Sequence, residues 1–248
     1  MALWGNKCDL SISAGANNSQ VADPLAQLQL LRPHILCDES DAVWHRLSDR
    51  KKPTKRVDIV LDNAGFELFT DLCLADFLVT RLGVEVVHFH AKSMPWFVSD
   101  VTPNDWKWTL EKLSSSEDAD VSCLARRWKE LVVKGSWKFQ VNPFWTLPND
   151  FEAMERLVPD LFLDLKTSDL IVFKGDLNYR KLAGDLKWAP TTSFRSALRG
   201  FCPAPLCTLR TLKCDLVVGL GEGVAEKAAK ESEDWMLTGS FAVIQFVS

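Results

Sequence analysis

The sequence predicts an α/β fold in which a mostly parallel sheet carries helices on both faces, with a ligand site at the carboxyl ends of the strands. The first observation is a short, β-branched apolar block at 57–61, which is typical of a strand buried on both faces. A helical pattern follows it from 67 to about 81. The second observation is that strand and helix patterns keep alternating along the chain, which favours parallel pairing through helical crossovers.

The other elements follow from the same patterns. Residues 11–23 are rich in Ser, Ala, Gly and Asn and predict a loop, followed by a helical stretch that ends near Leu47. Further strands are expected at 84–90, 170–173, 206–209, 215–218 and 241–246, and helices at 103–114, 122–134 and 152–166. We therefore expect a helical and loop segment, 1–55, packed on an α/β domain, 56–248.

Composition excludes several classes of protein. The chain has 248 residues, 47% of them hydrophobic, and a net charge of −4, so neither a nucleic-acid partner nor a membrane partner is expected. The N-terminus lacks the basic start and apolar core of a signal peptide, which predicts an intracellular protein, in the cytoplasm or the nucleus. Seven scattered cysteines without a C-x-x-C pair predict buried, reduced thiols.

The junction after the first strand is the first candidate site. Asp62 and Asn63 follow the apolar block directly, and Gly65 precedes the helical pattern. In open α/β sheets, ligands bind at this edge. The alternative is that the acid and the amide only cap the helix while the glycine makes the turn. The run alone does not choose between these interpretations.

A second junction repeats the first. The apolar strand before Lys174 opens into Gly175 and Asp176, and Asn178 and Arg180 follow them. A glycine lets backbone amides approach an anion closely, and an arginine can bind two phosphate oxygens. An Asx-type turn with a solvated arginine is the alternative. Because both junctions lie at one edge of the predicted sheet, a shared ligand site is favoured.

Other motifs carry weaker signals. Arg210 and Lys213 could neutralise a phosphate, and Asp100, which follows large apolar residues, needs a partner if it is buried. His88 and His90 lack a third ligand at metal spacing and are expected to be packed or edge histidines. The glycine-rich run 219–223 resembles a dinucleotide or methyl-donor loop, but too little chain follows it to complete such a unit.

Four motifs together carry a resemblance to a known family: LDNAGFEL at 61–68, WFVSD at 96–100, FKGDLNYRKL at 173–182 and RTLK at 210–213. With these motifs in this order, the chain resembles the damage-control phosphatase family, domain of unknown function 89. It is most similar to the branch of sugar-phosphate phosphatases and acidic-residue methyltransferase-like proteins. The resemblance runs from about Leu3 to the C-terminus.

The resemblance implies roles for particular residues. One divalent metal is expected on Asp62, Asn63 and Asp100, a hard ligand set that suits Mn²⁺ first, with Mg²⁺, Co²⁺ or Ni²⁺ as alternatives. Asp62 and Lys213 are the expected catalytic residues. The expected substrate-binding residues are Asp62, Asn63, Asp176, Leu177, Asn178, Tyr179, Arg180 and Lys213.

The expected function is metal-dependent hydrolysis of small phosphomonoesters, such as fructose 1-phosphate or fructose 6-phosphate. Water is favoured as the attacking group over the Asp62 carboxylate, since a carboxylate held on a metal is a poorer nucleophile. Family members carry helices before the segment that matches LWGNKCDLS, so a truncated form is expected here. Two alternatives stay open: a form that binds metal or metabolite without turnover, and an S-adenosylmethionine-dependent protein carboxyl methyltransferase.

Overall fold

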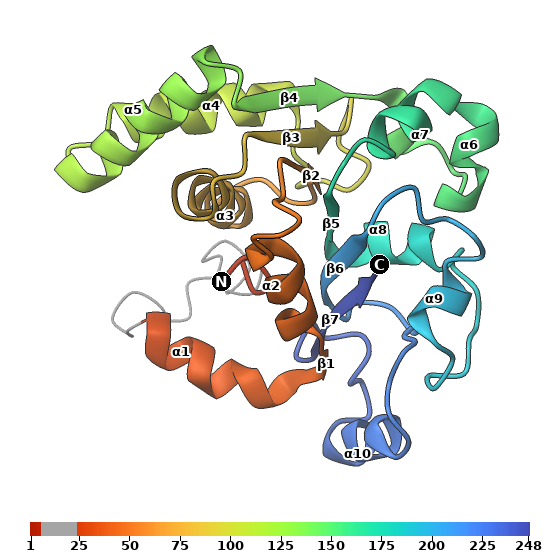
Figure 1. The fold of residues 1–248 in the computed structure, drawn as a ribbon. Coiled ribbons are helices and arrows are strands. Elements are labelled where there is room, and N and C mark those ends of the chain that lie inside the picture. Colours follow the sequence, from red (N-terminus) through yellow and green to blue (C-terminus); the bar gives the residue numbers. More distant parts are fainter. Residues whose placement is uncertain (6–23) are drawn as a thin grey trace.

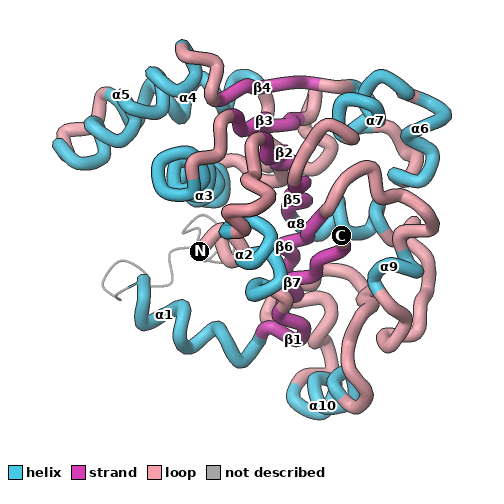
Figure 2. The backbone as a smooth tube through the Cα atoms, in the orientation of Figure 1, coloured by secondary structure: helices cyan, strands magenta, loops and turns pink. Residues whose placement is uncertain are grey.

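The computed structural model describes residues 1–5 and 24–248, and its centre is one seven-stranded sheet (Figure 1). The strands lie in the order β1-β7-β6-β5-β2-β3-β4 and form the continuous column of Figure 2. Their bounds are β1 Ile35–Asp38, β2 Arg56–Val60, β3 Val86–Ala91, β4 Trp137–Val141, β5 Leu170–Lys174, β6 Leu206–Thr211 and β7 Ala242–Val247.

The sheet is parallel except where β7 runs antiparallel to β6. From β2 the chain adds β3 and β4 on one side, and then returns to add β5 and β6 on the other. The order therefore reverses between β2 and β5. A crevice opens at the carboxyl ends of strands at such a switch point, and this is where α/β sheets bind ligands.

Helices cover both faces of the sheet (Figure 1). One apolar core joins β2 and β3 to α3, α4 and α5, and the other joins β5 and β6 to α7, α8 and α9. The helices are α1 Pro24–Leu31, α2 Ser40–Ser48, α3 Phe66–Leu82, α4 Pro103–Ser114, α5 Ala119–Val133, α6 Met154–Leu157, α7 Pro159–Leu165, α8 Gly175–Leu182, α9 Phe194–Ala197 and α10 Val224–Glu231. The predicted fold class is thus confirmed.

Three predictions of elements were wrong or incomplete. The expected strand at 215–218 is a loop, because side chains bind its backbone: Arg210 donates to the carbonyl of Leu216, and Gln245 donates to that of Val218. The helix expected at 152–166 is interrupted before Pro159, whose ring cannot continue a helix from the preceding turn. Strands β1 and β4 were not predicted.

The N-terminal part of the described chain joins the sheet directly. Strand β1 pairs with β7, so part of the expected helical and loop segment 1–55 is a strand of the sheet itself. Cys8 and the loop predicted at 11–23 lie outside the described residues, and the other six cysteines carry no disulfide. Cys123 is exposed rather than buried. No helix in the described ranges has the length and apolar character to cross a membrane.

Candidate functional site

Asp62 and Asn63 lie where the sequence predicted, in the turn between β2 and α3. The Asp62 side chain is 8% exposed. The Asn63 amide donates to Asp62 Oδ2 at 2.7 Å and to Glu67 Oε2 at 2.8 Å. Gly65 supplies the turn with a left-handed φ of 72°, and no side chain caps α3. The acid and the amide are therefore not helix caps, and the start of α3 does not use their oxygens.

The loop after β3 brings Asp100 to the same place. Val101 N donates to the carbonyl of Asp62 at 2.9 Å, and Ser99 Oγ donates to Asn63 Oδ1 at 2.6 Å. Asp100 is 2% exposed, and one of its oxygens accepts from Phe97 N. The fold thus gathers the three residues expected to bind metal, although Asp100 is 37 or more positions from the other two.

Two buried lysines accompany these acids, and neither was among the predicted site residues. Lys92 Nζ lies 2.5 Å from Asp100 Oδ1 and 3.6 Å from Asp62 Oδ1. Lys174 Nζ lies 3.0 Å from Glu67 Oε1 and 2.9 Å from Asp71 Oδ1. Each lysine ends or follows an apolar strand, where a charge must find a partner. That position was the only signal that could have indicated them.

We call these side chains the Asp62 cluster: Asp62, Glu67, Asp71, Asp100, Lys92 and Lys174. All six are buried. Four carboxylates face two ammonium groups, so the ionised cluster carries an excess of two negative charges. Burial raises the pKa of Asp62 to about 7, which Lys92 opposes and Glu67 and Asp100 reinforce. The cluster would be stabilised by a further positive charge.

The second junction contributes the start of α8. Gly175 has a φ of 80°, and a Cβ at this position would lie 1.9 Å from Asp62 Oδ2, so only glycine lets the carboxylate approach this closely. The first backbone amides of α8 lie beside the same space, and a helix N-terminus favours an anion. Asp176, Leu177 and Arg180 point to the cavity described below.

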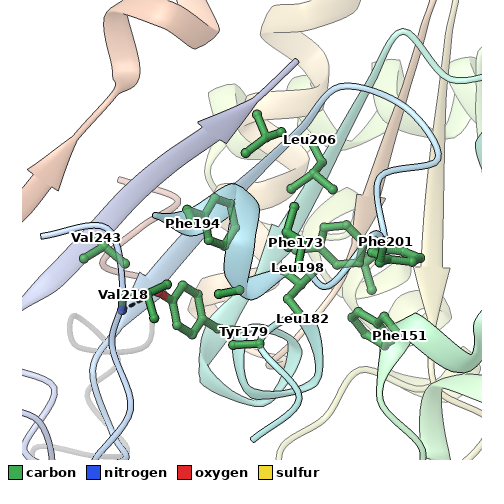
Figure 3. Close-up of a cluster of buried hydrophobic side chains, with 14 of the residues drawn as sticks. Phe151, Phe173, Tyr179, Leu182, Phe194, Leu198, Phe201, Leu206, Val218 and Val243 are labelled. Atoms are coloured by element: carbon green, nitrogen blue, oxygen red, sulfur yellow. Dashed lines mark hydrogen bonds between the residues drawn. The ribbon is translucent and has the colours of Figure 1, made fainter. Parts of the chain in front are cut away.

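Asn178 and Tyr179, two expected substrate residues, lie on the opposite side of α8. Asn178 is 2% exposed and donates to the carbonyls of Leu61 and Lys174. Tyr179 is fully buried among apolar side chains, and its hydroxyl accepts from Val218 N at 3.1 Å (Figure 3). The motif forms helix α8, and its residues divide with the helical period: Asp176, Leu177 and Arg180 face the cavity, and Asn178 and Tyr179 face the core.

The basic motif at the end of β6, Arg210 to Lys213, also divides between the core and the cavity. Arg210 is 0% exposed, stacks 4.1 Å from the Tyr179 ring and donates to Asp176 Oδ1 at 2.8 Å. Its donors are thus used inside the protein, and the expectation that it meets a phosphate is replaced by a role in holding Asp176. Lys213 is exposed, and its side chain lines the cavity.

These groups surround a cavity of about 460 Å³. One side carries the carboxylates of Asp62 and Glu67 and the amide of Asn63. The other side carries the start of α8 and the cationic side chains of Arg180 and Lys213. The cavity is lined by Leu3, Asp62, Asn63, Glu67, Phe97, Ser99, Gly175, Asp176, Leu177, Arg180, Leu209, Thr211 and Lys213. Arg180 also binds Asp185 through two hydrogen bonds of 2.9 and 2.7 Å, which fixes its guanidinium at the rim.

The donor set fits a hard divalent cation. Asp62, Asn63 and Asp100 offer carboxylate and amide oxygens, and the charge excess of the cluster equals the charge of such an ion. A second group, Asp58, His88 and Asp164, has ligand atoms that all lie within 4.8 Å of one another. There, however, Arg56 donates to both carboxylates at 2.8–2.9 Å. The guanidinium thus neutralises both carboxylates of that group, whereas Lys92 hydrogen-bonds only Asp100 among the three expected ligands and lies 3.6 Å from Asp62 Oδ1.

We call this second group, with Arg56 and His90, the Asp58 cluster. His90 Nε2 lies 2.7 Å from Asp58 Oδ1, and His88 Nδ1 bonds Gln140. Both histidines are buried, as the sequence indicated. Burial acts to raise the pKa of Asp58, but hydrogen bonds from His90 and Arg56 outweigh it and lower that pKa to about 2. This cluster is an internal ion-pair network.

Sheet order, crevice and lining residues define an α/β protein with its ligand site at the switch point of a parallel sheet. Residues 1–228 match the model of the damage-control phosphatase ARMT1-like domain. The chain belongs to this family, which confirms the resemblance seen in its motifs.

Curated relatives named damage-control phosphatase ARMT1 are similar over almost the whole chain. The zebrafish (Danio rerio) protein is 52% identical over 254 residues, covering 100% of this chain and 57% of its own length. The human protein is 45% identical over 251 residues, covering 99% of this chain and 57% of its own. The chain therefore spans a little over half the length of these relatives.

A solved structure of a DUF89 family protein from Pyrococcus horikoshii also aligns with 97% of this chain and 64% of its own, with a TM-score of 0.47 and 14% sequence identity.

Proposed function

We propose that this protein is a metal-dependent phosphatase that hydrolyses small phosphomonoesters, with sugar phosphates such as fructose 1-phosphate and fructose 6-phosphate as the favoured substrates and Mn²⁺ as the favoured metal. The observation that carries the proposal is the two-sided cavity. Its acidic side attracts a cation, its other side attracts an anion, and both open into one space. A phosphate ester with a divalent cation has this distribution of charge. The name of the similar proteins, damage-control phosphatase, supports the same activity.

In this proposal, the metal binds to Asp62, Asn63 and Asp100. When bound, a divalent cation supplies positive charge that polarises a phosphoryl oxygen. The amides at the start of α8 and the ammonium of Lys213 hold the other phosphate oxygens and stabilise charge on the transferred group. Asp176 accepts from Lys213 N at 3.0 Å and so fixes the backbone that carries this lysine.

Arg180 has a narrower part in the proposed mechanism. Because Asp185 already binds two of its nitrogens, it contributes a guanidinium of fixed orientation at the cavity rim. The attacking group is water in the favoured form of the mechanism, and the Asp62 carboxylate in the other. A phosphorylated Asp62, trapped and identified by mass spectrometry, would select the second form.

The experiment is phosphate release from a panel of sugar phosphates. The purified chain is stripped with chelator and then loaded with Mn²⁺, Mg²⁺, Co²⁺ or Ni²⁺, alongside Asp62→Ala and Lys213→Ala. Asp160→Ala and Lys187→Ala are matched controls, because both side chains are exposed and neither lines the cavity. We expect metal-dependent release in the wild type and in the controls only. A folded wild type that binds Mn²⁺ without releasing phosphate would support a binding protein instead.

A further inference from the structure

The first five residues, Met1–Gly5, lie against α3 and the cavity; we call them the N-terminal strap. Trp4 is 2% exposed, so the strap is anchored by a large buried ring. Leu3, one residue earlier, lines the 460 Å³ cavity together with Asp62 and Lys213. It is an apolar side chain in a wall that otherwise carries mostly polar and charged groups. The strap is therefore part of the cavity surface.

Gly5 sets how closely the strap approaches α3. A Cβ at this position would lie 2.7 Å from the Cα of Glu67 and 2.8 Å from Thr70 Oγ1. The first contact is with helix backbone, which cannot move aside as a flexible side chain can. Any side chain at position 5 would thus push the strap away from α3, at the turn that carries Glu67.

A chain of hydrogen bonds leads from the strap to the expected metal ligands. The carbonyl of Ala2 accepts from Lys174 Nζ at 2.5 Å. Lys174 also donates to Glu67 Oε1 at 3.0 Å, and Glu67 Oε2 accepts from the Asn63 amide at 2.8 Å. Because a carboxylate accepts only from the nitrogen end of an amide, Glu67, together with Asp62 Oδ2 and Ser99 Oγ, fixes which way the Asn63 oxygen points.

We propose that the N-terminal strap is a working part of the site with two roles. Through Ala2 O, Lys174 and Glu67 it positions the Asn63 amide for metal binding, and through Leu3 it supplies an apolar surface against the part of the substrate that does not carry the phosphate. The substrate class is a phosphomonoester whose leaving group presents a carbon–hydrogen face to Leu3. This inference rests on the proposed function.

The positioning role is tested by Mn²⁺ binding. Gly5→Ala should weaken Mn²⁺ affinity, measured by calorimetry, by about 10-fold or more, as loss of outer-shell support commonly does. Gly221→Ala is the matched control, because a Cβ there meets only Val224 at an ordinary 3.6 Å. Circular dichroism checks that both variants are folded. Control-like Mn²⁺ affinity in folded Gly5→Ala would overturn the inference.

The contact with the substrate is tested by kinetics. Leu3→Ala should leave Mn²⁺ affinity unchanged but raise KM for the best sugar phosphate about fivefold, with little change in the inhibition constant of inorganic phosphate, which lacks carbon. Leu163→Ala, with a side chain 57% exposed on α7, is the control. An unchanged KM in Leu3→Ala overturns the inference even if Gly5→Ala fails to fold. If the wild type does not bind Mn²⁺, the proposed function is wrong, and this inference fails with it.

Discussion

Two buried carboxylates lie four residues apart, Asp58 in the middle of β2 and Asp62 just beyond its end. Their surroundings differ in how completely the charge of the carboxylate is neutralised. Asp58 meets a guanidinium and a histidine at hydrogen-bond distance and lies in a closed network. Asp62 meets an ammonium group only at 3.6 Å, beside two further acids and an open cavity.

The difference shows that a buried carboxylate can have two roles in one sheet, in fold stability or in a ligand site. Inside the strand, the chain supplies every counter-charge, so the pKa of Asp58 falls and the carboxylate stabilises the fold. At the strand end, counter-charge is left incomplete, so the pKa of Asp62 rises and the carboxylate is held in an unfavourable state. An unbalanced, partly open acid is the arrangement expected of a ligand site.

The largest expected effect separates the two acids by activity. Asp62→Asn should lower phosphate release by about 10³-fold, since the variant loses a metal ligand and its charge. The fold should be unharmed or slightly more stable at pH 8, because a repelled buried charge is removed. Activity assays and urea unfolding, done on one preparation, measure both. Wild-type activity in Asp62→Asn would break the comparison.

The next-largest effect is a loss of stability with metal binding retained. Asp58→Asn should cost about 3 kcal/mol of unfolding free energy, because the buried Arg56 and His90 lose their charged acceptor. Mn²⁺ affinity should stay within about twofold of the wild type, since no ligand changes. Urea denaturation and calorimetry check the two statements. A large loss of Mn²⁺ binding without loss of stability would indicate that the metal binds at the Asp58 cluster.

Metal addition sharpens the contrast further. At 100 times its dissociation constant, Mn²⁺ should stabilise the native protein by about 2.7 kcal/mol, seen as a rise in Tm. The rise should disappear in Asp62→Asn and persist in a folded Asp58→Asn. Differential scanning calorimetry with and without chelator makes the measurement, and an equal rise in both variants would contradict it.

The contribution of Asp58 to stability should be lost in acid. The pKa of Asp58 in the folded protein is about 2, below the ordinary value of 3.8. The stabilisation of the folded state by the Asp58 carboxylate is therefore complete above pH 4 and is lost as the pH falls towards 2. The difference corresponds to about 2 kcal/mol. Urea unfolding between pH 5 and 2 measures it, and Asp58→Asn should show a shallower loss of stability over the same range.

The smallest effect concerns the inward side of α8. Tyr179→Phe should cost about 1–2 kcal/mol, because Gln245 and Val218 lose their buried partner. KM for sugar phosphates should not change, since the ring faces the core (Figure 3). A raised KM without loss of stability would return Tyr179 to the substrate-binding residues that the motif suggested.

Much of the fold could be predicted from local pattern. The block at 57–61 and the helix after it were predicted closely, because burial on both faces leaves a continuous apolar run. Strand β4 was not predicted, although its sequence WKFQV alternates apolar and polar residues as a half-buried strand does. The loop at 215–218 was taken for a strand because apolar residues look alike whether side chains or neighbouring strands bind their backbone.

The sequence by itself determined the family, most of the succession of strands and helices, and the placing of Asp62, Asn63 and Gly175 at strand ends, since these depend on local periodicity and on motifs of fixed spacing. Tertiary structure alone decided which residues of the α8 motif face the cavity, that Arg210 is used inside the protein, and that Lys92, Lys174 and the N-terminal strap join the site. The physical reason is that counter-charges and cavity walls come from distant parts of the chain, and only packing determines which side of a helix is buried.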